Sequence, residues 1–287
     1  MNVLAFIEDG EPSLQALTMA RAFGDVHSVA ADAVTPFAPD ALAAVLQLAA
    51  DDLNAGAVFA AGTERGNDVL ARLAARSGLP LAANVVAADP SGAVTRQRWG
   101  GSLLETAHLH SGRLLVTVAP FAVRVVAGPA PTPVDVESYV AKLDPRDLVV
   151  RIAEHIDPPG GGVSLAEAKV VVSGGRGVGS KEGFAIIEEL AGLLGGRVGC
   201  SRVVTSAGWR PHTDQVGQTG TKISPELYIA CGISGATQHM AGCKGAKKIL
   251  AINADPDAPI MSLADYSVVG DLKEVVPAIS AEIRKSR

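Results

Sequence analysis

Short apolar segments that alternate with segments of helical periodicity limit the fold of this chain more than any other feature. Asn2 to Ile7 is an apolar segment, and a helical pattern with a proline in its first turn follows from Pro12 to Phe23. The alternation continues through apolar segments at 26–31 and 57–61 and helical patterns at 40–51 and about 64–77. This βαβαβα order predicts a parallel sheet with right-handed crossovers.

The helical periodicity stops between about Leu81 and Val126. Leu103 to His110 and Arg113 to Ala119 alternate around a turn at Ser111-Gly112, which predicts antiparallel strands at one end of the sheet. Leu148 to His155 reads as a further strand. The run Asp157-Pro-Pro-Gly-Gly-Gly then breaks the pattern, so we predict two domains, residues 1–160 and 161–287.

The second half repeats the alternation of strand and helix. We predict strands at 169–172, from 198 toward Val204, and at 227–230, 249–252 and 266–269, with helices at 181–194, 234–240 and 271–283. The fold class is therefore α/β, with two Rossmann-like domains, each a mostly parallel sheet flanked by helices.

Composition narrows the class of protein. Apolar residues make up 48% of the 287 residues, and the net charge is −5 without a basic stripe, which argues against a nucleic-acid partner. The three cysteines have no metal-like spacing, the N-terminus lacks the basic region of a signal peptide, and no apolar run could span a bilayer. We expect a soluble, cytoplasmic protein that is not membrane-embedded.

Two glycine-rich turns could hold a phosphate. The turn from Ser173 to Ser180 misses the Gly-x-Gly-x-x-Gly spacing because Ser180 stands where the third glycine should be, so a plain tight turn is an equal alternative. Arg176 favours a ligand, since a charged side chain in such a turn has no core to pack against. The turn from Gly232 to Ala236 opens the next helix and presents Ser234 and the N–H groups of Gly235 and Ala236.

A hydrolase nucleophile elbow is an alternative interpretation of Ser234. The elbow needs a second glycine where Ala236 stands, and an acid followed by a histidine later in the chain. His239 is the last histidine and lies five residues after Ser234, so this alternative fails on chain order.

Other polar residues at strand ends have simple structural explanations when each is taken alone. Arg202 could be a surface arginine, His239 a buried histidine bonded to backbone, and Asp271 a helix N-cap. The polar cluster at 63–68 is better explained by a solvated loop before a capped helix. Ligands of open parallel sheets lie beyond the carboxyl ends of the strands, so several polar strand ends in one sheet indicate a dinucleotide site.

The motifs of the second half, taken together, resemble the α subunit of electron-transfer flavoproteins. The resemblance is close from Lys169 to about Ile283 and looser in the first half, where Gly62-Thr-Glu-Arg-Gly-Asn departs from the family pattern. The motifs are Val-Val-Ser-Gly-Gly-Arg-Gly (171–177), Gln-Val-Gly-Gln-Thr-Gly (215–220), Pro-Glu-Leu-Tyr-Ile-Ala-Cys-Gly-Ile-Ser-Gly-Ala-Thr-Gln-His (225–239), Ile-Asn-Ala-Asp-Pro-Asp-Ala-Pro-Ile (252–260) and Ala-Asp-Tyr (264–266).

The resemblance implies an FAD site in the C-terminal domain. Thr219 would bond flavin N5, His239 would address O2 and Arg202 would lie over the ring, while Ser234 and its neighbours would hold the pyrophosphate and Asn253 and Asp271 the adenosine end. The implied cofactor contacts are Arg176, Ser201, Arg202, Val216, Gly217, Gln218, Thr219, Ser234, Gly235, Ala236, Thr237, Gln238, His239, Asn253, Asp271 and Leu272.

The resemblance also implies partners. The chain would form a heterodimer with a β subunit that contacts the N-terminal domain and holds AMP or a second FAD. It would be an electron carrier rather than an enzyme, with one FAD per α subunit, no catalytic residues and no metal. It would take electrons from flavin dehydrogenases such as acyl-CoA dehydrogenases, as in fatty acid β-oxidation, and pass them to a membrane quinone oxidoreductase. The alternatives are a bifurcating carrier that uses NADH, and an NAD-dependent enzyme on a similar fold.

Overall fold

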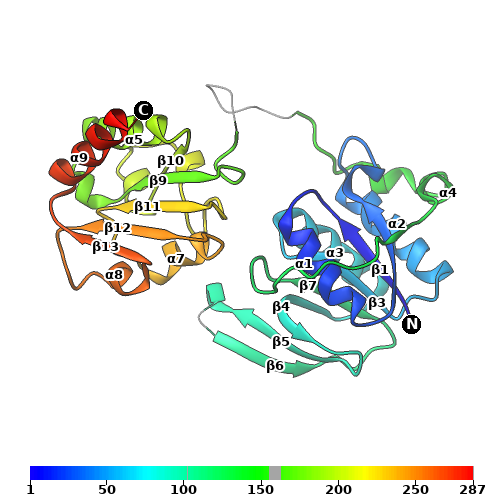
Figure 1. Cartoon of the computed structure of the whole chain (residues 1–287). Coiled ribbons are helices and arrows are strands. Elements are labelled where there is room, and N and C mark those ends of the chain that lie inside the picture. Colours follow the sequence, from blue (N-terminus) through cyan, green and yellow to red (C-terminus); the bar gives the residue numbers. More distant parts are fainter. Residues whose placement is uncertain (102, 155–162, 287) are drawn as a thin grey trace. The chain divides into compact units, whose positions relative to one another are not determined.

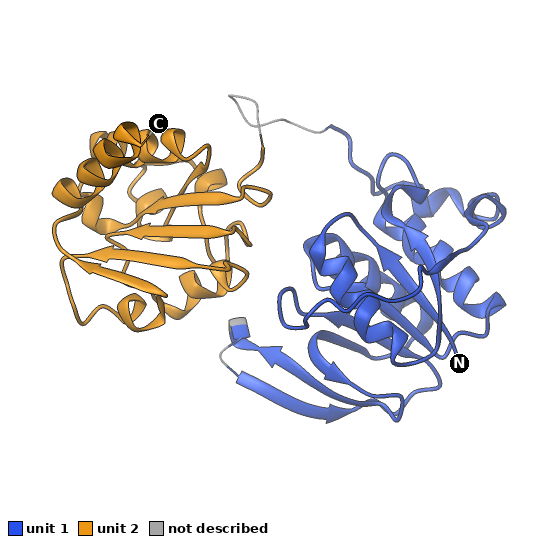
Figure 2. Cartoon of the chain, in the orientation of Figure 1, with its two compact units in different colours: residues 1–156 blue, residues 157–287 orange. Residues whose placement is uncertain are grey.

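The computed structural model describes residues 1–101, 103–154 and 163–286, and the chain divides into two compact units, 1–156 and 157–287 (Figure 2). The domain boundary predicted between residues 160 and 161 lies outside the described residues. Both units are α/β, as predicted, and each has a mostly or wholly parallel sheet with helices on both faces (Figure 1).

The first unit is built on an eight-stranded sheet in the order β6-β5-β4-β7-β3-β1-β2-β8. Its strands are β1 (Asn2–Ile7), β2 (Asp25–Ala30), β3 (Ala57–Ala61), β4 (Leu81–Ala88), β5 (Ala93–Arg98), β6 (Leu103–His108), β7 (Leu114–Val118) and β8 (Thr132–Pro133). Its helices are α1 (Glu11–Arg21), α2 (Pro39–Asp52), α3 (Glu64–Ser77) and α4 (Val136–Val140). The core residues of α2 and α3 pack on one face of β1 and β3, and those of α1 pack on the other.

Antiparallel strands do lie at one end of this sheet, but the predicted pairing was wrong. β4 pairs antiparallel with β5 and β5 with β6, whereas β7 pairs in parallel with β3 and β4 in the middle of the sheet. Every residue of β7 is buried. A fully buried and mainly apolar run is typical of a central parallel strand, and this outweighed the local turn signal at Ser111-Gly112.

The strand predicted from Leu148 to His155 is absent over its described part, 148–154. Leu148 instead ends a short 3-10 helix, Pro145–Leu148, in which Asp144 and Asp147 form a capping box. Val149 and Val150 are exposed, so this apolar run does not pack as a strand of the sheet. His155 lies outside the described residues.

The second unit has a five-stranded, wholly parallel sheet in the order β10-β9-β11-β12-β13. Its strands are β9 (Val170–Gly174), β10 (Arg197–Cys200), β11 (Leu227–Cys231), β12 (Ile249–Asn253) and β13 (Tyr266–Val269). Its helices are α5 (Ala185–Leu193), α6 (Arg202–Ser206), α7 (Thr237–Cys243), α8 (Pro259–Leu263) and α9 (Leu272–Lys285). Core residues of α5 and α9 pack on one face, and those of α7 and α8 on the other.

Two boundaries in this unit differ from the predictions. β10 ends at Cys200 and α6 begins at Arg202, so no strand extends toward Val204. α7 begins only at Thr237, three residues after the predicted start, because Gly232 and Gly235 have positive φ values of 62° and 85°. A right-handed helix does not admit these angles, so Ser234 belongs to a loop.

No described helix combines the length and the apolar character needed to cross a bilayer.

Candidate functional site

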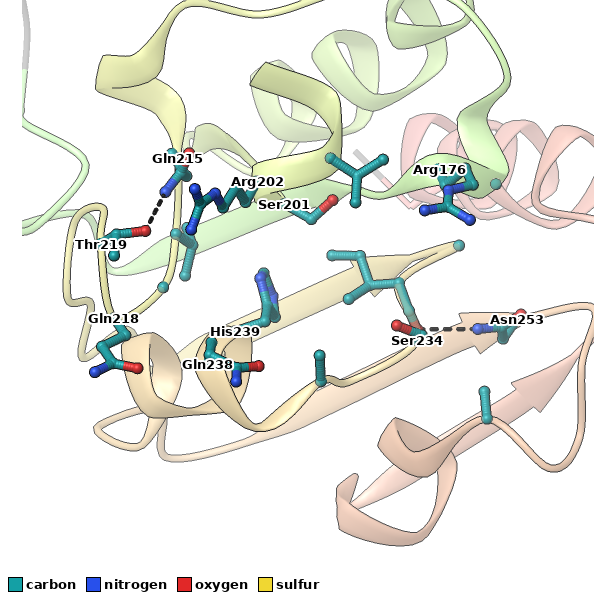
Figure 3. Close-up of a pocket in the computed structure, with 18 of the residues that line it drawn as sticks. Arg176, Ser201, Arg202, Gln215, Gln218, Thr219, Ser234, Gln238, His239 and Asn253 are labelled. Atoms are coloured by element: carbon teal, nitrogen blue, oxygen red, sulfur yellow. Dashed lines mark hydrogen bonds between the residues drawn. The ribbon is translucent and has the colours of Figure 1, made fainter. Parts of the chain in front are cut away.

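A cavity of about 640 Å³ lies at the carboxyl ends of the strands of the second unit (Figure 3). β10 follows β9 in the chain and lies on one side of it, and β11 lies on the other side, so the connections leave β9 and β11 in opposite directions. Open α/β sheets bind ligands at such a switch point. The residues that line the cavity come from the segments after β9, β10, β11 and β12.

Twelve of the residues predicted from the sequence line this cavity. They are Arg176, Ser201, Arg202, Val216, Gly217, Gln218, Thr219, Ser234, Ala236, Gln238, His239 and Asn253. The structure thus gathers segments that are up to about eighty residues apart in the chain.

Four predicted residues do not line the cavity: Gly235, Thr237, Asp271 and Leu272. Asp271 is the N-cap of α9, where its carboxylate accepts from the Lys273 N–H at 2.9 Å. Leu272 is the first residue of α9 and is buried in the core. Both positions have a complete structural explanation, and their contact with a cofactor stays a prediction.

Two arginines line the cavity without an anionic partner. Arg176 and Arg202 make no ion pair or side-chain hydrogen bond with any described residue, and both are exposed. Arg210, by contrast, pairs with Glu188 and with Asp214. In Figure 3, Arg176 lies near Ser234 and Asn253, and Arg202 lies at the other end near Thr219 and His239. Positive charge is therefore available at both ends of the cavity.

The loop from Gly232 to Ala236 is held by its carbonyl groups. The Ile233 carbonyl accepts from Asn253 Nδ2 at 2.9 Å, and the Ser234 carbonyl accepts from the Ile260 N–H at 3.1 Å. The N–H groups of Ser234, Gly235 and Ala236 donate to no described residue. Backbone N–H groups that are left without acceptors in a loop are suited to binding an anion.

Glycines allow this loop to lie directly against the loop after β9. A Cβ on Gly175 would come within 2.2 Å of the Gly232 carbonyl oxygen, and a Cβ on Gly177 within 2.8 Å of Gly232 Cα. The Gly177 N–H donates to the Gly232 carbonyl at 3.1 Å. The glycine-rich turn predicted at 173–180 is thus required for close backbone packing beside the cavity.

Asn253 has both parts of its amide engaged within the chain. Besides its bond to Ile233, its Oδ1 accepts from the Asp255 N–H at 3.1 Å. Asn253 therefore braces the loop that forms the cavity wall, and a direct contact with a ligand stays a prediction.

His239 is buried and belongs to α7. Its Nε2 lies 2.6 Å from the Tyr228 hydroxyl oxygen, while its Nδ1 is a buried atom with no hydrogen-bond partner among the described residues. Burial lowers the pKa of His239 to about 4, and a weaker influence of the Val216 backbone opposes this shift. The ring is therefore neutral near pH 7 and keeps one nitrogen free for a ligand.

Gln215 is a buried lining residue that begins the 215–220 motif but was not among the predicted cofactor contacts. Its Nε2 donates to Thr219 Oγ1 at 3.0 Å, and its Oε1 accepts from Thr205 Oγ1 at 2.7 Å. Gln215 thereby fixes Thr219, which Figure 3 shows beside it. The other lining residues that were not predicted are Gly177, Val203, Gly232, Ile233, Asp255 and Ala258. Their neighbours in the same strand-end segments were the available signal for them.

The cysteines are unsuited to nucleophilic chemistry. Cys200, Cys231 and Cys243 are free and buried, and burial raises the pKa of each thiol to about 12. Thiols in this state are protonated at neutral pH and act as small apolar groups.

Known protein families match both units. Residues 164–244 match the family model described as the electron transfer flavoprotein FAD-binding domain, and residues 7–142 match the electron transfer flavoprotein domain. The chain is 37% identical over 252 residues to the electron transfer flavoprotein subunit alpha of Bacillus subtilis, which covers 87% of this chain and 77% of that protein. It is also 37% identical over 260 residues to the protein of that name in Mycobacterium leprae, covering 90% and 81%. The protein of the same name in Paracoccus denitrificans is 40% identical over 231 residues, which cover 79% of this chain and 72% of that protein.

Proposed function

The chain belongs to the α-subunit family of electron-transfer flavoproteins, and from that premise we propose that its second unit holds one FAD in the cavity at the ends of β9 to β12. With a β subunit, it would accept electrons from flavin dehydrogenases, such as acyl-CoA dehydrogenases. It would pass them to a quinone oxidoreductase in a membrane.

The residues present fit a dinucleotide. The observation that carries the proposal is a set of polar groups that have no partner among the described residues: His239 Nδ1, the guanidinium groups of Arg176 and Arg202, and the N–H groups of residues 234–236. A buried polar atom such as His239 Nδ1 normally has a partner within the protein, and the two exposed arginines add positive charge at both ends of the cavity, so the set points to an anionic ligand. The cavity volume of about 640 Å³ lies within the usual range for small-molecule sites.

The residues at the two ends of the cavity suit different parts of FAD. Ser234 and the free N–H groups after it would hold the pyrophosphate, with Arg176 supplying positive charge nearby. Arg202, Thr219 and His239 would surround the isoalloxazine ring. When bound, FAD supplies the one- and two-electron redox chemistry.

At the end of the cavity that would hold the isoalloxazine ring, the positive charge comes from Arg202 rather than from His239. Because burial lowers the pKa of His239 to about 4, the imidazole is neutral at pH 7 and can contribute only a hydrogen bond. The guanidinium group of Arg202 is the cation at this end of the cavity. An arginine beside the ring would favour a negatively charged reduced cofactor and so raise its midpoint potential.

An electron carrier, rather than an enzyme with its own substrate, is the activity that these side chains support best. The thiols are protonated at neutral pH, and Ser234 has no acid–base partner in the order that a hydrolase needs. The side chains around the cavity are suited to binding a group and tuning its charge.

The visible spectrum of the purified α/β complex tests this function directly. We expect flavin absorbance with one FAD per heterodimer. Two FAD per heterodimer would favour the bifurcating alternative, and a colourless protein that binds NAD would overturn the proposal.

Arg202→Ala tests the electrostatic role. We expect FAD affinity to fall about tenfold or more and the midpoint potential to become more negative, since a hydrogen bond to a charged group contributes about 1.5–3 kcal/mol. Arg284→Ala is the matched control, because Arg284 belongs to the same unit and is exposed in an ion pair with Glu189. Equal potentials in the two variants would contradict the role of Arg202.

A further inference from the structure

Tyr228 is a fully buried tyrosine in the middle of the second unit's sheet. It lies on β11, and its side chain packs among the apolar residues beneath α7 and α8. Its hydroxyl oxygen lies 2.6 Å from His239 Nε2, and the two rings are tilted by 35° at a centroid distance of 6.1 Å. This short hydrogen bond joins the sheet core to the wall of the cavity.

The direction of this hydrogen bond follows from the number of protons available. A tyrosine hydroxyl has one proton, and His239 Nε2 is the hydrogen-bond partner of Tyr228 among the described residues. Ser173 lies on the same face of the sheet and lowers the pKa of Tyr228, but its Oγ is not in hydrogen-bonding geometry with any described residue. If the ring donated to the hydroxyl oxygen, the Tyr228 proton would be left unpaired in the core, which costs a buried group far more than it costs an exposed one.

We propose that Tyr228 is a positioning residue that donates its hydroxyl proton to His239 Nε2, fixes the imidazole as the Nδ1–H tautomer and so supplies the cavity with a neutral N–H donor. This inference rests on the proposed FAD function, since it assigns the direction of one hydrogen bond toward that cofactor. Neither Tyr228 nor the tautomer is evident from the strand-end pattern of the sequence.

The surroundings of the ring agree with this tautomer. Burial keeps His239 neutral at pH 7, so only one of its two ring nitrogens carries a proton. The tautomer therefore decides whether Nδ1 is a donor or an acceptor. Burial raises the pKa of Tyr228 well above its ordinary value, so the hydroxyl keeps its proton.

The tautomer decides what the cavity can accept. With Nδ1 protonated, the ring offers a donor to a carbonyl oxygen or to an oxygen that gains negative charge. With Nδ1 unprotonated, the same position offers a lone pair and repels such an oxygen. Tyr228 therefore acts on the ligand through His239, at a distance from the cavity.

The tautomer can be measured without any cofactor. The full chain is labelled with ¹⁵N-histidine, and the two-bond couplings of each imidazole are recorded at pH 7, where a His239→Gln sample identifies the His239 signals. We expect an unprotonated Nε2 and a protonated Nδ1 in the wild-type chain. A protonated Nε2 in the wild-type chain would overturn the proposal.

Tyr228→Phe removes only the hydroxyl group, and Tyr266→Phe is its matched control. Tyr266 lies on β13 of the same unit and is 60% exposed. We expect the Nε2–H tautomer to become populated in Tyr228→Phe and to stay undetected in Tyr266→Phe. An unchanged tautomer in folded Tyr228→Phe would overturn the proposal.

A second readout uses the α/β complex after removal and return of FAD. We expect the FAD dissociation constant to rise about threefold to tenfold in Tyr228→Phe, as the loss of one well-directed hydrogen bond predicts, with no change in Tyr266→Phe. An unchanged dissociation constant despite a changed tautomer would refute the role toward the ligand. If the wild-type complex binds no FAD, the proposed function fails, and the tautomer measurement alone still decides whether Tyr228 orients His239.

Discussion

The two units of this protein use the ends of their central strands in opposite ways. In the first unit, Glu8 after β1 accepts a hydrogen bond from Thr63 Oγ1 at 2.5 Å, and Thr63 after β3 accepts from the Gly66 N–H at 2.9 Å. In the second unit, the Arg202 side chain, which follows β10, and His239 Nδ1, in the helix after β11, have no hydrogen-bond partner among the described residues. The polar groups at these strand ends of the first unit are hydrogen-bonded to one another, whereas those of the second unit are available to a ligand.

Topology alone does not account for this difference. β1 of the first unit lies between β2 and β3, so this sheet has a switch point as well. Among the described residues, the hollow beside it is lined by Glu8, Asp9 and Glu11 and by no lysine or arginine, whereas the cavity of the second unit is lined by two arginines. A switch point offers a crevice, and the unpaired charge around it decides whether an anionic ligand can bind.

The largest effect that separates the two units is expected from Gly175→Ala. The new Cβ would lie 2.2 Å from the Gly232 carbonyl oxygen, where only backbone movement could relieve the contact. We expect the second unit to lose about 3 kcal/mol of its free energy of unfolding, at the upper end of the usual range for overpacking. Urea denaturation followed by Trp209 fluorescence in a Trp99→Phe background measures this unit, since these are the two tryptophans of the chain.

Gly192→Ala is the matched control for that variant. Gly192 lies in α5, and a Cβ there would meet no atom within 4 Å. Alanine in a helix should raise the free energy of unfolding by about 0.5–1 kcal/mol. If both variants behave alike, the contact between the two glycine loops does not support the cavity.

The stability of the second unit should also fall in mild acid because of His239. The pKa of His239 is about 4 in the folded chain, below its ordinary value. Between about pH 6.5 and pH 4 the unfolded chain therefore binds a proton that the folded chain does not, which lowers the free energy of unfolding by up to about 3 kcal/mol as the pH falls.

His239→Gln should remove this step from the pH profile of the Trp209 transition. The profile of the variant should stay flatter than that of the wild-type chain from pH 6.5 to pH 4, with the two slopes converging below pH 4. Parallel profiles across that interval would show that His239 is not the group responsible.

Substitution of one threonine in each unit should have smaller effects that distinguish the two units directly. Thr63 is the N-cap of α3, so Thr63→Ala should cost about 1–2 kcal/mol in the first unit and leave FAD affinity unchanged. Thr219 is exposed and bonded to Gln215, so Thr219→Ala should have little effect on unfolding and should weaken FAD binding about threefold to tenfold.

Hydrogen exchange of the β1 and β3 amides and FAD titration separate the effects of these two variants. A loss of FAD affinity in Thr63→Ala would show that the first unit also contributes to the cofactor site. Reduced protection of β1 and β3 in Thr219→Ala would equally contradict the contrast between the two strand ends.

The smallest effect is expected at Glu8. Burial raises the pKa of this carboxyl group, so the folded chain prefers the protonated form and loses stability as the pH rises through the folded pKa. Glu8→Gln keeps an acceptor for Thr63 without the charge. We expect the protection of β1 amides at pH 7 to be equal or slightly higher in this variant, and a clear loss would mean that the ionised carboxylate is required.

The local elements and their ends could be predicted where the signal lies within one segment. Asp271 at the start of α9, Thr63 before α3 and the buried strand from Ala57 to Ala61 are examples. The pairing of β7 and the late start of α7 could not be predicted in this way. The first depends on which distant strands are already neighbours. The second depends on the positive φ angles of Gly232, which packs against the loop after β9, and of Gly235, which packs against Ile260.

The features of the candidate site also fall into those set by local sequence and those set by tertiary packing. The sequence by itself determined the fold class, the strand ends and most of the residue types around the cavity, because side-chain periodicity and turn chemistry are local properties. Only the tertiary structure decided that Tyr228 meets His239, that Gln215 meets Thr219 and that Glu8 meets Thr63. A hydrogen bond depends on distances near 3 Å between side chains, and in these cases it is the packing of separate segments that sets those distances.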